Sequence, residues 1–265
     1  MKIKQIVSAL ERFGPLPLQD GFDNAGLQIG LTEAEATGAL LCLDVTEAVL
    51  DEAIALGYNL VISHHPLIFK GYKSITGKDY VERCILKAIK NDIVIYSAHT
   101  NLDNAYGGVN YKIAEKIGLK NLQVLEPKEN SLQDDLTQAG AGIVGELDEP
   151  ETELEFLKRI KKTFEVGCVR HNRLTGREIQ KVALCGGAGA FLLPRAIRAG
   201  ADVFITGEIK YHDYFGHEGD ILMAEIGHYE SEQYTKEIFY SIIRDLFPNF
   251  ALQSSKINTN PIKYL

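Results

Sequence analysis

AIALGYNLVISHH at residues 53–65 and AIRAGADVFITGE at residues 196–208 are the two stretches that decide the fold. In each stretch, a helical pattern is closed by a glycine, Gly57 or Gly200. A short apolar strand follows and ends in a hydroxyl residue. Because these features fall in the same order at the same spacing, the two stretches indicate an internal repeat.

The match continues on both sides of these stretches. The further matching segments are 40–44 with 182–186, 93–99 with 221–228, and His99-x-x-x-Asp103 with His228-x-x-x-Glu232. The series predicts an α/β fold of two similar domains related by duplication, with a two-metal site in the cleft between them. We place these domains at residues 1–125 and 126–265, joined through a linker-like stretch at 125–142, and the tail at 250–265 is free to pack back on the first.

Strands and helices alternate along the first half, which predicts a largely parallel sheet. The expected elements are helices at 3–13, 46–57, 80–90 and 111–117 and strands at 39–43, 59–62 and 93–97. In the second half we expect a strand at 143–147, a helix beginning near Pro150, and a helix at 234–247.

Charge excludes one class of partner. The 265 residues include 28 Lys and Arg against 36 Asp and Glu, a net charge of −8. Nucleic-acid binding requires a positive footprint, so we do not expect it here. A basic group at 158–162 is interpreted as the C-terminal part of a solvated helix.

Cysteine usage and hydropathy indicate the compartment. The four cysteines form no C-x-x-C pair and are interpreted as buried thiols in a reducing environment. The N-terminus lacks the apolar core of a signal peptide, and no apolar run approaches the length of a membrane span. The expectation is a cytoplasmic protein without a membrane partner.

His64 and His65 end the strand in the first repeat. Neighbouring residues on an extended strand point to opposite faces, so the pair is expected to serve two ions on either side, unless one histidine is structural. Pro66 favours an extended backbone at His65 and makes a helical arrangement improbable.

His228 and Glu232 begin the helix in the second repeat, four residues apart. At that spacing an imidazole and a carboxylate share one face, and a glutamate can bridge two ions. The helix dipole alone would explain acidic residues there, but it does not explain His228.

His99 and Asp103 are expected in a loop at the same edge of the sheet. Asp103 is either a turn residue or, by the repeat, the equivalent of Glu232. Histidines and carboxylates without cysteine favour two zinc, iron, manganese, nickel or cobalt ions. The Gly186–Gly189 loop is either an anion-binding turn or a tight turn without a ligand.

Several motifs together resemble the GTP cyclohydrolase I type 2 homologues, also called the Nif-three-like family. They are residues 23–30 (DNAGLQIG), 63–66 (SHHP), 99–103 (HTNLD), 186–189 (GGAG) and 227–232 (GHYESE). The resemblance covers nearly the whole chain and implies a binuclear metal centre between two α/β domains and a toroidal homohexamer. It implies the ligands His64, His65, Asp103, His228 and a bridging Glu232.

Two departures from the family pattern are visible. Phe22 stands where the family usually has Trp, and the chain has no Trp. The short stretch between the halves leaves no room for the domain that some members carry there.

Two functions from different classes follow. The first is a metal-dependent hydrolase that opens a nucleotide ring or performs a related hydrolysis, with Glu208 and His99 as acid/base candidates or structural residues. The alternative is a metal-binding adaptor or metal-handling ring protein without turnover.

Overall fold

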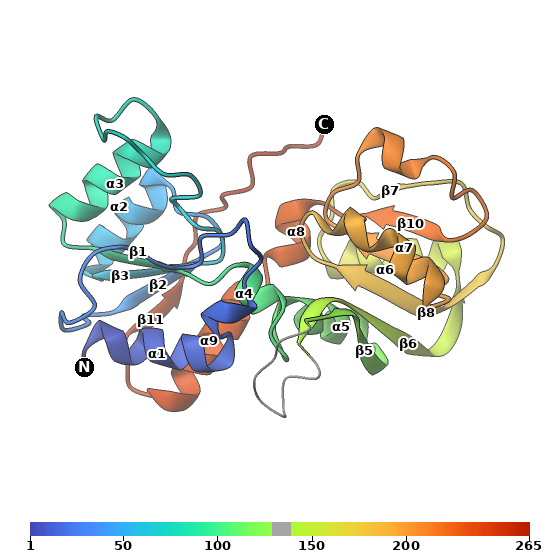
Figure 1. Cartoon of the computed structure of the whole chain (residues 1–265), viewed down its shortest axis with the longest axis horizontal. Coiled ribbons are helices and arrows are strands. Elements are labelled where there is room, and N and C mark those ends of the chain that lie inside the picture. The colour runs from blue at the N-terminus through green and yellow to red at the C-terminus, as the bar shows by residue number, and fades with distance from the viewer. Residues whose placement is uncertain (129–138) are drawn as a thin grey trace. The chain divides into compact units, whose positions relative to one another are not determined.

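The computed structural model describes residues 1–128 and 139–265 (Figure 1). The chain forms two compact units, and each contains its own sheet. Unit 1 comprises residues 1–102 and 235–261, and unit 2 comprises residues 103–234 and 262–265. These units differ from the predicted division at 125/126 in two places: residues 103–125 belong to unit 2, and residues 235–261 belong to unit 1.

The sheet of unit 1 has the strand order β1-β4-β3-β2-β11. Its strands are β1 (Gly26–Ile29), β2 (Ala39–Cys42), β3 (Leu60–Ser63), β4 (Val94–Ser97) and β11 (Leu252–Ser254). The pairs β11·β2, β2·β3 and β3·β4 are parallel, and only β1 runs antiparallel. The largely parallel sheet predicted for this half is confirmed.

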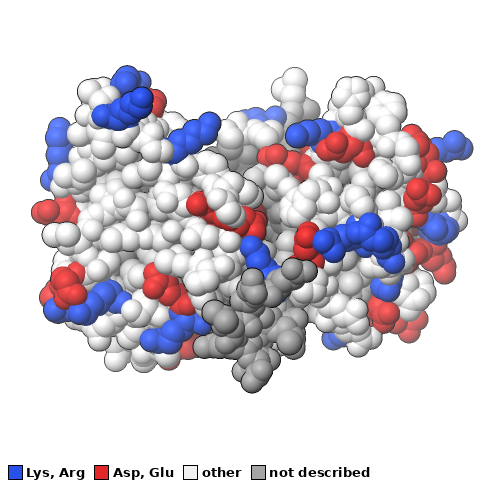
Figure 2. All heavy atoms as spheres, viewed as in Figure 1, with Lys and Arg blue, Asp and Glu red and all other residues white. Residues whose placement is uncertain are grey.

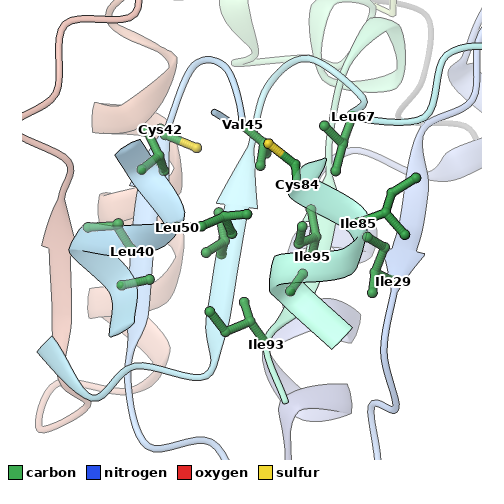
Figure 3. Packing of buried hydrophobic residues seen from close by; sticks show 14 of the residues in the cluster. Ile29, Leu40, Cys42, Val45, Leu50, Leu67, Cys84, Ile85, Ile93 and Ile95 are labelled. Atoms are coloured by element: carbon green, nitrogen blue, oxygen red, sulfur yellow. The ribbon is translucent and has the colours of Figure 1, made fainter. Parts of the chain in front are cut away.

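Helices cover both faces of this sheet (Figure 1). They are α1 (Ile3–Phe13), α2 (Glu47–Leu56), α3 (Tyr80–Lys90) and α9 (Thr235–Leu246). Leu50 of α2 and Ile85 of α3 join Ile95 of β4 in one buried cluster, shown in Figure 3. This continuous apolar layer holds the ends of β3 and β4 in place, where the candidate histidines begin.

The sheet of unit 2 has the order β5-β6-β8-β9-β10-β7. Its strands are β5 (Lys120–Pro127), β6 (Gly140–Thr152), β7 (Arg170–His171), β8 (Glu178–Cys185), β9 (Val203–Thr206) and β10 (Leu222–Glu225). Only β8·β9 and β9·β10 are parallel, so this sheet is mixed. The predicted similarity of the two domains therefore does not extend to the outer strands of this sheet.

The remaining α-helices of the described residues lie mainly in unit 2. They are α4 (Thr100–Asp103), α5 (Val109–Ile117), α6 (Glu153–Thr163), α7 (Leu193–Arg198) and α8 (His228–Glu232). The basic residues near the end of α6 follow an acidic first turn, as expected for a solvated helix, and Arg159 pairs with Glu151 at 2.8 Å. On the face drawn in Figure 2, acidic side chains lie among the basic ones.

The predicted linker differs most from the observed fold. Its centre, residues 129–138, lies outside the described residues. Its two flanks are the strands β5 and β6, which pair antiparallel, and β6 continues through the expected helix start to Thr152. Glycines and a proline in the sequence suggested a loop, but β5 and β6 form a hairpin-like pair at the edge of the sheet.

The tail and the cysteines follow the predictions in part. Residues 250–261 belong to unit 1, as the expected packing back on the first half requires, whereas residues 262–265 belong to unit 2. Three cysteines are buried thiols, but Cys168 is exposed. Within the described parts of the chain, no helix has the length and apolar character needed to cross a membrane.

Candidate metal centre

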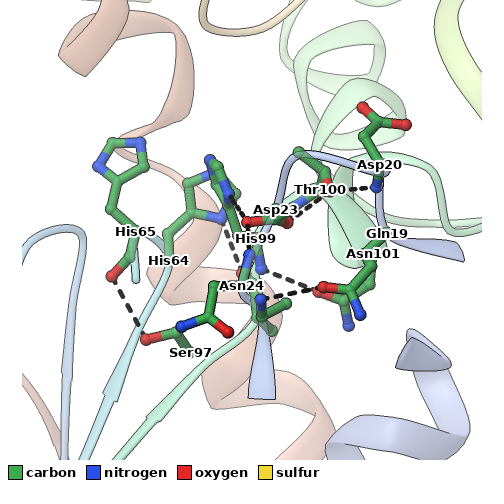
Figure 4. A network of polar contacts seen from close by, with 12 residues as sticks. Gln19, Asp20, Asp23, Asn24, His64, His65, Ser97, His99, Thr100 and Asn101 are labelled. Carbon is green, nitrogen blue, oxygen red and sulfur yellow. Dashed lines mark hydrogen bonds and ion pairs between the residues drawn. The ribbon is translucent and has the colours of Figure 1, made fainter. Parts of the chain in front are cut away.

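Three histidines of unit 1 converge just beyond the ends of β3 and β4 (Figure 4). One ligand nitrogen from each of His64, His65 and His99 lies within 4.8 Å of the others. The rings of His64 and His65 are 4.9 Å apart, centroid to centroid. The expectation that these neighbours point to opposite faces is wrong, because β3 ends at Ser63 and both residues lie in the bend that follows it.

The strand ends are joined by a hydroxyl pair. Ser63 and Ser97 are opposite each other in the β3·β4 register, and their Oγ atoms are 2.8 Å apart. The Ser63 hydroxyl also lies 2.9 Å from the carbonyl oxygen of His65, to which it donates. These bonds fix the turn that carries His64 and His65.

The ring nitrogen Nδ1 of every candidate histidine is held by an acceptor. The pairs are His64 with the Ala98 carbonyl at 2.9 Å, His65 with Asp44 at 2.7 Å, His99 with Asp23 at 2.7 Å, and His228 with Glu208 at 2.8 Å. A carbonyl or a carboxylate accepts but does not donate, so each Nδ1 carries the proton. In the neutral form of each imidazole, Nε2 then has the lone pair, which is the tautomer needed by a metal ligand.

Asp23 anchors His99 from the segment that precedes β1. Its Oδ1 accepts from His99, and its Oδ2 accepts from the backbone N–H and the hydroxyl of Thr100. Burial raises the pKa of Asp23, but the hydrogen bonds from His99 and Thr100 outweigh it and lower the pKa to about 2. Asp23 is thus a fixed negative charge behind the imidazole.

Asp44 performs the same task for His65. Its Oδ1 accepts from His65, and its Oδ2 accepts from the hydroxyl of Thr259 at 2.5 Å. Burial raises the pKa of Asp44, yet the bond from His65 and the contact with Thr259 hold it below its usual value. No role was predicted for Asp44 or Asp23 from the sequence, although Asp44 directly follows a predicted strand and Asp23 begins one of the family motifs.

Unit 2 brings His228 and Glu232 together on α8. His228 Nε2 lies 3.1 Å from Glu232 Oε2, so the predicted shared helix face is confirmed. Glu208, two residues beyond β9, holds the other nitrogen of His228. The structure therefore places Glu208 as the residue that orients a candidate ligand.

The Gly186–Gly189 loop is a tight turn whose amides are engaged by the protein. The amides of Gly186, Gly187 and Gly189 donate to Asn110 Oδ1, Ser231 Oγ and Thr206 Oγ1, respectively. Of the two interpretations left open, the structure favours the turn without a bound anion. A side chain at Gly187 would overlap the Glu232 carboxylate and come within 3.3 Å of His228 Nε2.

Asp103 ends the short helix α4 rather than lying in the expected loop. Its side chain is half-buried, and its carbonyl accepts from the Asn110 side chain at 3.0 Å. The helix begins directly after His99, whose backbone N–H donates to Asn101 Oδ1 at 2.9 Å. The convergence of Asp103, His228 and Glu232 with the histidines of unit 1 on one pair of ions stays a prediction.

The donor set fits a metal ion in its chemistry. Imidazole nitrogens and carboxylate oxygens suit zinc, iron, manganese, nickel and cobalt, and the outer carboxylates set the imidazole tautomers. These groups of His, Asp and Glu can hold a metal ion.

Known proteins match this chain over nearly its whole length. A family model described as Duf34/NIF3 (NGG1p interacting factor 3) matches residues 1–261. A Clostridium perfringens protein named GTP cyclohydrolase 1 type 2 homolog is 37% identical over 235 residues, covering 88% of this chain and 87% of the relative. A protein of the same name from Lactococcus lactis is 34% identical over 271 residues, covering 98% of each chain.

A solved structure agrees with these sequence matches. The crystal structure of a hypothetical protein from Staphylococcus aureus matches with a TM-score of 0.91 at 31% identity, covering 100% of this chain and 99% of that chain. The resemblance inferred from the motifs is confirmed.

Proposed function

Because the chain belongs to the Duf34/NIF3 family, we propose that it is a metal-dependent hydrolase that binds two divalent ions per chain. The observation that carries this proposal is the set of four histidines whose Nδ1 atoms are each held by a carbonyl or carboxylate oxygen, which leaves Nε2 of the neutral imidazole available to a metal ion. Carboxylates that hold imidazoles in this way are a common feature of metal sites. The names of the curated relatives support hydrolysis of a nucleotide ring or a related bond.

The proposed ligands are the five residues implied by the motifs. They are His64, His65, Asp103, His228 and Glu232, with Glu232 bridging the ions. Two divalent ions in such a site would lower the pKa of a water molecule and polarise a substrate oxygen. Five protein ligands leave coordination positions for water and substrate.

His99 is proposed to move the proton. Asp23 keeps the proton on Nδ1, so Nε2 can accept a proton from the attacking water and return it to the leaving nitrogen or oxygen. The hydrolysis consumes one water and needs no other co-reactant. Glu208 is proposed to act through His228, since its carboxylate accepts from that imidazole.

Metal stoichiometry tests the proposal. Protein dialysed against Zn²⁺ or Mn²⁺ should contain two ions per chain by elemental analysis. Glu232→Ala should lose both ions, because it removes the negative charge between two cations, whereas His65→Ala should mainly empty one site. A Glu232→Ala variant that holds two ions as tightly as the unmutated protein would contradict the bridging role.

Turnover separates the hydrolase from the adaptor. The metal-loaded protein should hydrolyse members of a nucleotide panel, and Glu232→Ala should abolish that activity. Binding of two ions without turnover on nucleotides or generic esters would favour the non-catalytic alternative.

Two exposed aromatic rings beside His99 support a planar substrate. The side chains of Phe22 and Phe69 are 67% and 46% exposed, their centroids are 6.3 Å apart, and Phe69 lies 6.3 Å from the His99 ring. The backbone of Ile68 is pinned by Asn24 and Gln28, which keeps Phe69 in place. A nucleobase can stack on such rings.

Stacking predicts a selective loss of binding. Phe22→Ala and Phe69→Ala should each weaken binding of guanosine triphosphate by roughly 5- to 100-fold, the usual effect of removing an aromatic stacking partner. Binding of ribose 5-phosphate, which has no base, should not change. Phe22→Trp should keep nucleotide binding and supply a fluorescence signal in a chain without tryptophan. Equal loss for both probes would contradict stacking.

A further inference from the structure

The C-terminal segment of unit 1 is tied down along its length before it reaches Asp44. Strand β11 pairs in parallel with β2, and the next amide, that of Ser255, donates to the Leu41 carbonyl at 2.7 Å. Glu52 then accepts from the Ser255 hydroxyl at 2.5 Å and from the Lys256 amide at 3.0 Å. These contacts fix the backbone of the segment and therefore the position of the residues that follow Lys256.

Thr259 meets the carboxylate that holds His65. Its hydroxyl donates to Asp44 Oδ2 at 2.5 Å, while Asp44 Oδ1 accepts from His65 Nδ1 at 2.7 Å. A carboxylate held at one oxygen can still turn about its own bond, whereas one held at both oxygens is fixed. The direction of the His65 ring then depends on a residue that lies 194 positions further along the chain.

His99 shows the same arrangement built from a local partner. The carboxylate of Asp23 accepts from His99 at one oxygen, and at the other oxygen it accepts from Thr100, the residue next to His99. For His65 the corresponding hydroxyl comes from Thr259 in the C-terminal segment. Each of the two imidazoles is thus held by its own carboxylate, and each carboxylate is held by the hydroxyl of a threonine.

We propose that Thr259 is a positioning residue that aligns His65 for metal binding through Asp44. The proposal rests on the metal-binding part of the proposed function and not on turnover. It gives the C-terminal segment a role beyond completing the sheet, because the strand pairing and the Glu52 contacts already attach that segment to unit 1. Outer partners of metal-bound imidazoles commonly change metal affinity by 10- to 100-fold.

Zinc affinity in the full-length chain tests the proposal. In competition with a chelator, Thr259→Val should weaken one of the two zinc sites by about 10-fold and leave the other unchanged, the lower end of the range for outer partners. Thr259→Ser keeps the hydroxyl and should restore the affinity. In a His65→Ala background, Thr259→Val should have no further effect, because the ring that it aligns is gone.

Thr37→Val is the matched control in the same unit. The Thr37 hydroxyl donates to the Gly57 carbonyl at 2.7 Å and takes no part in the Asp44 contacts. This variant should lose stability in urea without losing zinc affinity. If Thr37→Val weakens zinc binding as much as Thr259→Val does, the effect is general destabilisation and the proposal is wrong.

A readout without metal keeps the proposal distinct from the proposed function. In metal-free protein, ¹⁵N NMR of the His65 ring should show the Nδ1–H tautomer, and Thr259→Val should shift the ring toward a mixture. That result with no zinc binding at all would overturn the proposed function and the metal-binding part of this proposal, while showing that Thr259 orients the His65 ring. Unchanged tautomer and unchanged zinc affinity in Thr259→Val would overturn the positioning role.

Discussion

A glycine suits position 187, beside the candidate ligands, for two reasons: its backbone angle and the lack of space for a side chain. Its φ of +59° lies in the left-handed region, where side chains are strained. A Cβ there would also overlap the Glu232 carboxylate, which would have to move away from its place beside His228. The glycine therefore serves the geometry of α8 and not the capture of an anion.

Gly187→Ala and a control variant together should separate the effect of backbone strain from the effect of steric overlap with Glu232. The left-handed backbone should cost about 1–2 kcal/mol of unfolding free energy, and displacement of Glu232 should lower zinc affinity as well. Gly200→Ala is the control, since Gly200 has a φ of +71° but no neighbouring atom within 4 Å of the Cβ that alanine would add. It should lose similar stability in urea and keep its zinc affinity. Equal zinc binding in both variants would show that Glu232 tolerates the added methyl group.

At the residue scale, the sequence predicted which histidines lie close together but not the backbone geometry that brings them together. The strand was predicted to end before His64, as β3 does, but the two histidines were expected to diverge on an extended backbone, whereas both lie in the bend that follows β3. That bend is held by hydrogen bonds from Ser63 and from its cross-strand partner Ser97 to the His65 carbonyl, which a single sequence does not reveal. Asp23 and Asp44 were missed for the same reason, since their partners lie 76 and 21 residues away.

Each unit uses a buried glutamate to hold a loop. Glu82 of α3 accepts from the amide and the hydroxyl of Thr76 and from the amide of Lys78. Glu153 of α6 accepts in the same way from Thr175 and Gly176. One carboxylate at the start of a helix thus satisfies several donors of a neighbouring loop.

Glu82→Gln should change the acid sensitivity of the fold. Hydrogen bonds from the backbone of Thr76, opposed by burial, lower the pKa of Glu82 to about 2. A lowered carboxyl pKa stabilises the fold above its unfolded value near 4.5, and this contribution is lost as the pH falls toward 2. The variant should be less stable than the unmutated protein in urea at pH 7, and the difference should shrink between pH 4.5 and 2.

Glu149→Gln, a change at an exposed glutamate, is the control for that experiment. Its unfolding curve should follow that of the unmutated protein at every pH. A Glu82→Gln difference that stays constant down to pH 2 would show that the loop contact does not depend on the charge.

Elements with local signals were predicted well. The hydroxyl of Thr46 accepts from the Val49 amide, and Gly57 ends α2 with a φ of +69°, so both helix limits followed from the sequence. Strand β5 was missed, and β6 was predicted only over 143–147, because the stability of both comes from pairing between segments, β5 with β6 and β6 with β8. Pairing between distant segments leaves a weaker pattern than a helix cap does.

The two units share a central arrangement that supports the proposed duplication. In unit 1 the parallel strands lie in the order β4-β3-β2, and in unit 2 the matching strands lie in the order β10-β9-β8. Strands added at the edges differ, since β2 is flanked by parallel β11 and β8 by antiparallel β6. The repeat in the sequence thus corresponds to the buried centre of each sheet, where packing restricts change most.

The assembly expected for the whole molecule is a homohexamer, as the resemblance implies. A single chain exposes large apolar side chains in both units, among them Leu31, Ile89, Phe191, Tyr211 and Phe215. Apolar surface of this kind is commonly covered by a partner, and further copies of the chain would cover part of it. The net charge of −8 per chain opposes such assembly, so apolar contacts must outweigh the repulsion.

Light scattering at micromolar concentration should give about six times the 29.4 kDa of one chain. Because salt screens the repulsion between acidic subunits but leaves apolar contacts in place, the hexamer should persist at 0.5 M NaCl, where the Debye length is only about 4 Å. Dissociation on adding salt would mean that ion pairs hold the subunits together. A mass of one chain at both low and high salt would contradict the homohexamer.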